Sequence, residues 1–143
     1  MPDKPTIFVD RSLGAHIVAN ALRAAGMRVI THDNLFDQDA SDEEWLLEVG
    51  RKNWIAISKD YARAQSTLQR LTVARTGACL FVLRTTASLK GPELAKVFVN
   101  VAPKMQRLAA SIPAPFIAKI YASGEVHLWK DRKTLLSELA KSG

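Results

Sequence analysis

The chain has 143 residues, 48% of them hydrophobic, and a formal net charge of +6. This length and composition predict a single globular domain over residues 1–143. The only cysteine, Cys79, excludes an internal disulfide and a cysteine-based zinc site, and favours a reducing compartment. No apolar stretch approaches the length of a membrane span, so we expect a cytoplasmic protein without membrane contact.

The amino-terminal part of the chain predicts strands that alternate with helices. Short apolar runs indicate strands at 6–9, 28–31, 54–57 and 78–83, and apolar residues three and four apart indicate helices at 13–25, 41–50 and 60–74. Ser41 and Glu44 match a capping box at the start of the second helix. Residues 32–40 are polar and turn-like, and Leu68 is expected to face the core from the third helix.

The remainder of the chain predicts a helix, a hairpin and a second, short helix. The first helix runs from Pro92 to about Ser111, and Pro103 should kink or split it. Strands at 116–121 and 125–129 form the hairpin, and the short helix covers 132–141. The expected fold is α/β, with three α/β/α layers around a mostly parallel central sheet and the hairpin as an antiparallel edge.

Acidic residues lie where three of these elements end or begin. Asp10 follows the first strand, Asp42 opens a helix together with Glu43, and Asp60 follows the third strand. The carboxyl ends of parallel strands share one edge of a sheet, so these acids can meet there. Neighbouring carboxylates repel one another unless a cation lies between them. The pattern therefore predicts a Mg²⁺ or Mn²⁺ site made by Asp10, Asp42 and Asp60.

Each acid also has an ordinary structural explanation. Asp10 and Asp60 could simply cap the helices that follow them, and Asp42 and Glu43 could complement the dipole of a first helical turn. The position of all three sites on the same predicted edge favours a common function over three separate caps. No nucleotide-binding glycine loop and no Ser/His/Asp or Cys/His set is apparent in the sequence.

Charge is distributed unevenly along the chain. Residues 1–60 carry seven Lys/Arg and ten Asp/Glu, whereas residues 61–143 carry thirteen and four. The first part is suited to hold a cation and the second to hold a polyanion such as RNA, although scattered surface Lys and Arg would give the same balance. The candidate RNA contacts are Arg63, Arg70, Arg75, Lys90, Lys130, Arg132 and Lys133, with base stacking by Tyr61 or Trp129 as a further option.

Three segments resemble the PIN-like nuclease superfamily. Residues 8–14, Phe-Val-Asp-Arg-Ser-Leu-Gly, resemble its opening strand and first acid, and residues 40–45, Ala-Ser-Asp-Glu-Glu-Trp, resemble the acidic start of its second helix. Residues 54–60, Trp-Ile-Ala-Ile-Ser-Lys-Asp, resemble its strand that ends in Ser/Thr-x-Asp. The resemblance is nearest to the compact branch that includes VapC-type toxins.

This resemblance implies a Mg²⁺- or Mn²⁺-dependent endoribonuclease that is the toxin of a type II toxin–antitoxin pair. The implied partners are an RNA substrate and a cognate antitoxin, and a homodimer is compatible with the family. Asp10 and Asp60 would be direct metal ligands, with Asp42 as the third acid and Glu43 as its competitor, while Ser58 would position a ligand or water. Many members carry a fourth acid near the end of the fourth strand, but residues 83–86 hold none, and Arg84 could contact phosphate there.

Two other interpretations stay open at this point. A receiver-like signalling domain would use Asp60 as phosphoacceptor, with Thr85 or Thr86 and Lys119 beside it. Against it, Asp10 is followed by an arginine and Lys119 is not followed by proline. A catalytically silent PIN-like binding module would explain the missing fourth acid.

Overall fold

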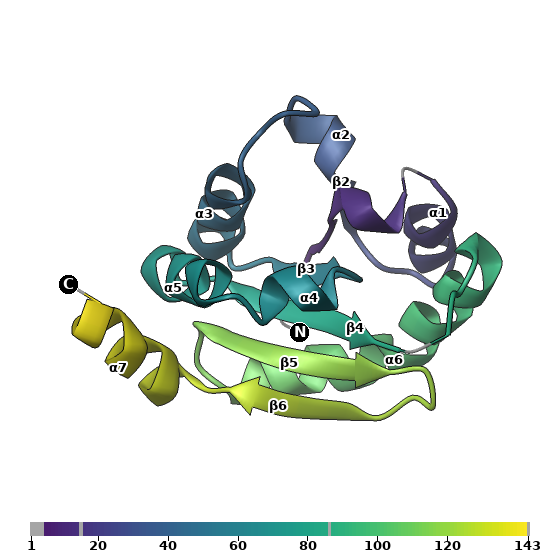
Figure 1. Cartoon of the computed structure of the whole chain (residues 1–143). Coiled ribbons are helices and arrows are strands. Elements are labelled where there is room, and N and C mark those ends of the chain that lie inside the picture. The colour runs from purple at the N-terminus through teal and green to yellow at the C-terminus, as the bar shows by residue number, and fades with distance from the viewer. Residues whose placement is uncertain (1–4, 15, 86, 143) are drawn as a thin grey trace.

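The computed structural model describes residues 5–14, 16–85 and 87–142. Six strands form one sheet in the order β2-β1-β3-β4-β5-β6 (Figure 1). The first five are parallel and β6 is antiparallel to β5, which confirms the α/β fold class and the antiparallel edge. The strands are β1 (Ile7–Val9), β2 (Val29–Thr31), β3 (Ile55–Ser58), β4 (Cys79–Arg84), β5 (Phe116–Tyr121) and β6 (Val126–Lys130).

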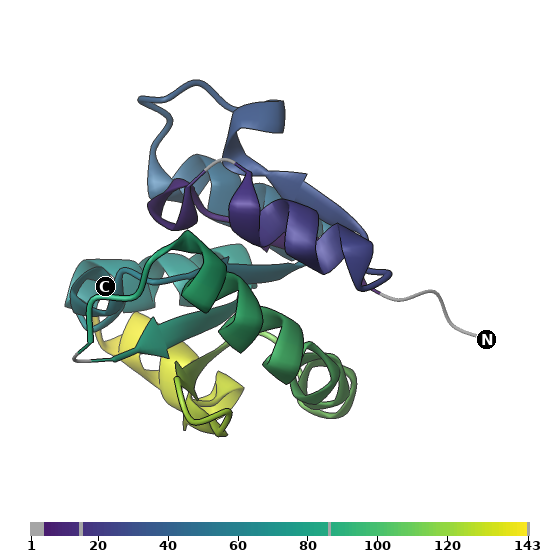
Figure 2. The same cartoon turned by 90° about the vertical axis from the view of Figure 1, so that its right-hand side faces the viewer.

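Helices cover both faces of the sheet. The helical elements are η1 (Arg11–Leu13), α1 (Ile17–Ala24), α2 (His32–Leu35), α3 (Asp42–Lys52), α4 (Tyr61–Ala64), α5 (Thr67–Thr76), α6 (Gly91–Ser111) and α7 (Arg132–Ser142). On one face α1 packs beside α6, as Figure 2 shows, and on the other α5 packs between α3 and α7. No helix among the described residues is long and apolar enough to cross a membrane.

The core consists of two apolar layers, one on each side of the sheet. Alternate strand residues supply them: in β4, Phe81 enters the layer under α1 and α6, while Leu80 and Val82 enter the layer under α3, α5 and α7. Aromatic rings fill the second layer, where Phe8 stacks on Trp45 with ring centroids 5.3 Å apart. Burial on both faces explains why the parallel strands are almost continuously apolar.

The helix predicted at 60–74 is two helices. Ser66 separates α4 from α5, and its Oγ accepts a hydrogen bond from the Gln69 backbone N–H at 3.1 Å. Because the axis changes there, Leu68 lies in the first turn of α5 with its side chain toward solvent, 74% exposed, so its predicted burial is wrong. Residues 32–40 are not all turn, since Thr31 and Asn34 cap the short α2.

The long helix α6 is not split at Pro103. The helix continues through Pro103, and the side chain of this residue is exposed. Proline has no backbone N–H, so the carbonyl four residues earlier lacks its helical donor, and water can bind to it instead. Phe98, Val101 and Met105 are buried on the opposite side, so packing holds the two halves of the helix together. At the other end of the chain, the predicted helix at 132–141 is present as α7, which extends one residue further.

Candidate metal site at the carboxyl edge of the sheet

The candidate acids lie near the switch point of the sheet. Strand β1 is flanked by β2 on one side and β3 on the other, so the connections that leave β1 and β3 diverge at their carboxyl ends. In open α/β sheets, ligand sites are found at this kind of crevice. Asp10 follows β1 directly, and its backbone N–H still donates to the Ile57 carbonyl of β3 at 3.1 Å. Asp60 lies two residues beyond the end of β3.

Asp10 is a buried carboxylate held by two hydroxyl groups. It is 6% exposed, and the Oγ atoms of Ser12 and Ser58 both donate to its Oδ2, each at 2.9 Å. Oδ1 receives no hydrogen bond from the described residues. A buried carboxylate needs hydrogen-bond donors, and these two donors satisfy Oδ2 and fix the direction of the carboxylate.

The same two serines connect the loops that carry the acids. Ser58 Oγ accepts from the Asp60 backbone N–H at 3.1 Å, and Ser12 Oγ accepts from the Lys59 backbone N–H at 3.2 Å. The two Oγ atoms are 3.2 Å apart. Ser58 was predicted to have a positioning role, but Ser12 was missed. A possible sequence signal was the matching two-residue spacing, Asp-x-Ser after β1 and Ser-x-Asp after β3.

Arg63 links the other two acids. Its Nη1 lies 3.0 Å from Asp42 Oδ2 and 3.2 Å from Asp42 Oδ1, and its Nε lies 3.5 Å from Asp60 Oδ2. Asp60 also caps α4, because its Oδ1 accepts from the Arg63 backbone N–H at 3.1 Å. One guanidinium therefore bridges two carboxylates that come from different helices and offsets one of their two negative charges. From the sequence, Arg63 is only one of several candidate RNA contacts.

Asp42 and Glu43 point to different partners. Besides Arg63, Asp42 binds the indole of Trp45, whose Nε1 donates to Oδ1 at 3.1 Å. Glu43 instead pairs with Arg75, at 3.4 Å, with both side chains about half exposed. Of these two candidates, only Asp42 belongs to the network that contains Asp60. The capping of α3 by Ser41 is as predicted, since its Oγ accepts from the Glu44 N–H.

The donor set suits a hard divalent cation, but the acids do not form a ready-made cage. Within the described residues, no group of three or more His, Cys, Asp or Glu side chains is placed to hold a metal ion. Asp10, Asp42 and Asp60 are instead joined in a chain through Ser58 and Arg63. Their oxygens are the ligands that Mg²⁺ and Mn²⁺ prefer. A metal held by all three would have to draw Asp42 and Asp60 away from Arg63.

The histidines do not join this network in the described part of the chain. His32 is buried beside the Phe36 ring, with centroids 5.7 Å apart, and neither of its ring nitrogens has a hydrogen-bond partner. His16 is exposed at the start of α1, and His127 lies against Tyr121 in the hairpin. They are therefore not part of the acidic site as the structure presents it.

The receiver-like interpretation is not supported by the position of its lysine. The Lys119 ammonium lies over the rings of Tyr61 and Trp129, 5.3 and 4.8 Å from their centroids, with no ion pair to Asp60. The Thr85 hydroxyl accepts from the Ala87 backbone N–H, and Thr86 lies outside the described residues. The end of β4 carries the exposed Arg84, as the sequence shows, where a fourth acid could have been.

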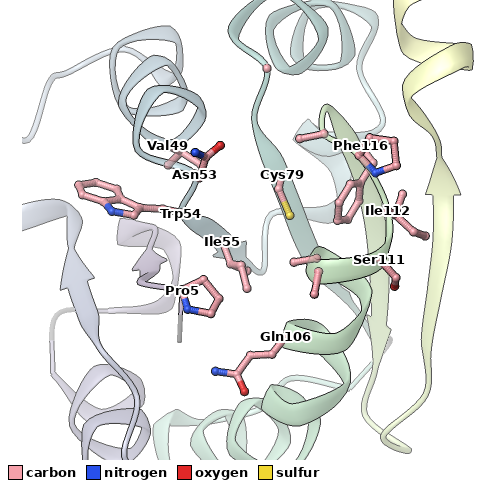
Figure 3. A pocket seen from close by; sticks show the side chains of 15 residues that line it. Pro5, Val49, Asn53, Trp54, Ile55, Cys79, Gln106, Ser111, Ile112 and Phe116 are labelled. Carbon is pink, nitrogen blue, oxygen red and sulfur yellow. The ribbon is translucent and has the colours of Figure 1, made fainter. Parts of the chain in front are cut away.

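A separate cavity of about 590 Å³ lies at the opposite edge of the sheet. Figure 3 shows that Ile55, Cys79 and Phe116, the first residues of three strands, line it together with the end of α6. Among the described residues, no Asp, Glu, Lys, Arg or His side chain lines this cavity. Burial raises the pKa of the Cys79 thiol, so it is not a reactive thiolate. This cavity is therefore not part of the acidic site.

Comparison with known proteins gives the class of this fold and site. The family described as "PIN like domain" matches residues 5–85, which include Asp10, Asp42, Glu43 and Asp60. The match spans more than half of the chain, and the chain belongs to this family. A relative from Mycobacterium tuberculosis, named "Putative ribonuclease VapC45", is 34% identical over 127 residues, which cover 86% of this chain and 91% of the relative. No solved structure matches.

Proposed function

We propose that this protein is a Mg²⁺- or Mn²⁺-dependent endoribonuclease and the toxin of a type II toxin–antitoxin pair. Membership of the PIN-like family and the ribonuclease name of the relative support this function. The structural observation that carries the proposal is the single network that joins Asp10, Asp42 and Asp60 at the switch point of the sheet.

In this proposal the acids hold the cation and the serines hold the acids. Asp10 and Asp60 are the direct ligands, Asp42 is the third acid, and Ser58 and Ser12 orient Asp10. When bound, the cation would supply an activated water and neutralise charge on the phosphodiester. Arg63 offsets part of the charge of Asp42 and Asp60 until that cation is present. The cognate antitoxin and the cytoplasm complete the proposed setting, and a homodimer is compatible with it.

The test is cleavage of an unpaired RNA by the purified protein with Mg²⁺ or Mn²⁺. Asp10→Asn and Asp60→Asn should each abolish cleavage, and so should removal of the cation with a chelator. Asparagine keeps the shape of the side chain, so thermal unfolding of the variants checks that the fold is retained. Cleavage that survives both substitutions would overturn the assigned site.

Two observations favour a second candidate, a PIN-like module that binds RNA without cleaving it. The end of β4 has no acid among its described residues, and Arg63 already occupies the carboxylates of Asp42 and Asp60. In that case RNA would bind to the wild-type protein but stay intact with either cation. The same assay, read both as binding and as cleavage, separates the two candidates.

A further inference from the structure

Cationic and aromatic side chains form a continuous series on the sheet face that carries α4. Arg84 lies over the Tyr61 ring, with its guanidinium carbon 5.1 Å from the centroid. Lys119 is shared between the rings of Tyr61 and Trp129, and Lys130 lies 5.4 Å from the Trp129 centroid. These five residues, from α4, β4, β5 and β6, are called the cation–aromatic surface below.

The register of the sheet explains why these side chains meet. Val82 and Arg84 alternate along β4 on the same face, and Lys119 pairs with Val82 in the adjacent strand β5. Lys119 in turn lies opposite His127 of β6, two residues before Trp129 on the same strand. Figure 1 shows α4 in front of the sheet and α7 at the far end of β6. Trp129 and Lys130 therefore lie at the end of β6 next to α7, whereas the hairpin end of β5 and β6 has no helix in front of it within the described residues.

The two central cations are not neutralised by acids. Lys130 pairs with Glu138 at 3.2 Å, but in the described part of the chain neither Arg84 nor Lys119 forms an ion pair. Two positive charges are thus brought to one tyrosine ring, and the attraction of each cation to the electron-rich ring face offsets part of their repulsion. Two neighbouring positive charges without an acidic partner attract anions.

The surface adjoins the acidic site. Tyr61 is the residue after Asp60, and its ring is fixed by α4 and by a hydrogen bond from Gln65 Nε2 to its hydroxyl at 3.2 Å. An anion held by Arg84 and Lys119 is therefore near the proposed point of cleavage. Tyr61 and Trp129 are only partly buried, so parts of both rings remain accessible to a ligand.

We propose that the cation–aromatic surface is a subsite for unpaired RNA next to the cleavage point, where Arg84 and Lys119 hold backbone phosphate and Tyr61 and Trp129 contact bases. Unpaired strands expose both groups, and proteins bind them with positive grooves and aromatic platforms. A duplex would present phosphates but no free base faces. Lys119, Trp129 and Lys130 lie outside the matched family region, residues 5–85, so the carboxyl-terminal part of the chain completes a subsite to which that region contributes Tyr61 and Arg84.

The role of this subsite in cleavage rests on the proposed function, but RNA binding can be measured separately. The probe is a fluorescent oligouridine, and the readout is anisotropy in the presence of a chelator, so that no cleavage occurs. The double variant Arg84→Gln/Lys119→Gln should bind at least 10-fold more weakly. Its slope of log affinity against log salt should be shallower by about 1.4, since each phosphate contact to a single strand contributes about 0.7.

The matched control removes the same charge from the other side of the sheet. Lys96 and Arg107 are exposed on α6, and Lys96→Gln/Arg107→Gln should bind like the wild type apart from a small general charge effect. Quenching of tryptophan fluorescence by oligouridine should decrease in Trp129→Phe, which would report contact with bases. Thermal unfolding of each variant checks that a loss of binding is not a loss of fold.

Equal affinity of the Arg84→Gln/Lys119→Gln and control variants would overturn the subsite. A double variant that loses binding of a polyglutamate peptide, but not of oligouridine, would also overturn it and assign the surface to an acidic protein partner. If the subsite variant loses oligouridine while the wild type never cleaves RNA with Mg²⁺ or Mn²⁺, the subsite stands and the nuclease function fails.

Discussion

The acidic site and the cation–aromatic surface lie next to each other but are built in opposite ways. The carboxylate of each acid in the site is restrained by hydrogen bonds or ion pairs, Asp10 by Ser12 and Ser58 and the other two acids by Arg63. Arg84 and Lys119 are restrained mainly by ring faces, which leaves their N–H groups available. The carboxylates are thus held in place where the cleavage is proposed, whereas Arg84 and Lys119 keep unpaired charges where a flexible polyanion is proposed to bind.

The largest effect is expected on RNA cleavage, from variants that test whether Asp42 or Glu43 belongs to the acidic site. Asp42→Asn should reduce RNA cleavage by roughly 100-fold or more, because removal of a charged ligand weakens the stabilisation that the cation supplies. Glu43→Gln should change cleavage by less than about threefold, since Glu43 pairs with Arg75 in a half-exposed salt bridge. Initial rates of cleavage at saturating Mn²⁺ measure both.

Glu44→Gln is the control for this pair, because it removes an acid from the same helical turn without touching Arg63 or Arg75. A larger loss in Glu43→Gln than in Asp42→Asn would exchange the two residues in the site. The network around Arg63 would then have only a structural role, and it would no longer mark the acidic site as the region where the cation is held.

The next prediction concerns the rigidity of the acidic site. Ser58→Ala removes a hydroxyl that donates to the buried Asp10 carboxylate and accepts from the Asp60 N–H. Loss of hydrogen bonding to a buried charged group should lower the free energy of unfolding by about 1.5–3 kcal/mol, measured by urea denaturation. Ser12→Ala should cost less, because Ser12 is only partly buried. Equal stability of Ser58→Ala and the wild type would contradict the proposed support of Asp10.

A smaller effect is expected from removing the internal cation. Arg63→Gln should increase the affinity for Mn²⁺ in the absence of RNA by several-fold, because binding no longer requires Asp42 and Asp60 to leave a guanidinium. Each exposed pair is worth up to about 1 kcal/mol. Calorimetric titration with Mn²⁺ measures this, with Arg51→Gln, an exposed residue of α3, as control. Weaker binding in Arg63→Gln would mean that Arg63 positions the acids and does not compete with the cation.

The smallest expected effect concerns the link between α5 and α7 beside the cation–aromatic surface. Partial burial by itself would raise the pKa of Glu138, but hydrogen bonds from Arg70 and Lys130 hold it below its usual value. Because the folded pKa is lowered, the stabilisation is present above the pKa of the unfolded chain and is lost as pH falls through the folded pKa. Glu138→Gln should therefore destabilise by less than about 1 kcal/mol at pH 7 and by nothing at low pH. Urea denaturation at pH 7 and at pH 3 checks this; the same loss at both would contradict it.

Much of the fold could be predicted because strand ends and helix caps are local signals. The apolar strands, the acids after β1 and β3, and the capping of α3 by Ser41 all follow from short motifs. The division between α4 and α5 also has a local signal, since Ser66 and Gln69 match the same capping-box pattern as Ser41 and Glu44. It was missed because the apolar spacing of residues 60–74 could be fitted by one continuous helix.

The relations among side chains of different elements could not be predicted in the same way. Arg63 looks like any solvent-facing residue of a helix, and its ion pairs with Asp42 depend on how α3 and α4 are placed on the sheet. Lys119 and Trp129 meet only because β6 pairs with β5 in a register that contains an irregularity near Ile117. Strand register and helix placement are set by packing over the whole domain, so no local pattern reveals them.

The proposed function requires that Asp10, Asp42 and Asp60 hold one divalent cation. A titration of Mn²⁺ into the wild-type protein and into Asp10→Asn without RNA, with bound Mn²⁺ measured by electron paramagnetic resonance, tests this claim. We expect one saturable site in the wild type that is lost or greatly weakened in Asp10→Asn, while both proteins unfold at similar temperatures. Equal binding of Mn²⁺ by the two folded proteins, or no binding by the wild type, would contradict the claim.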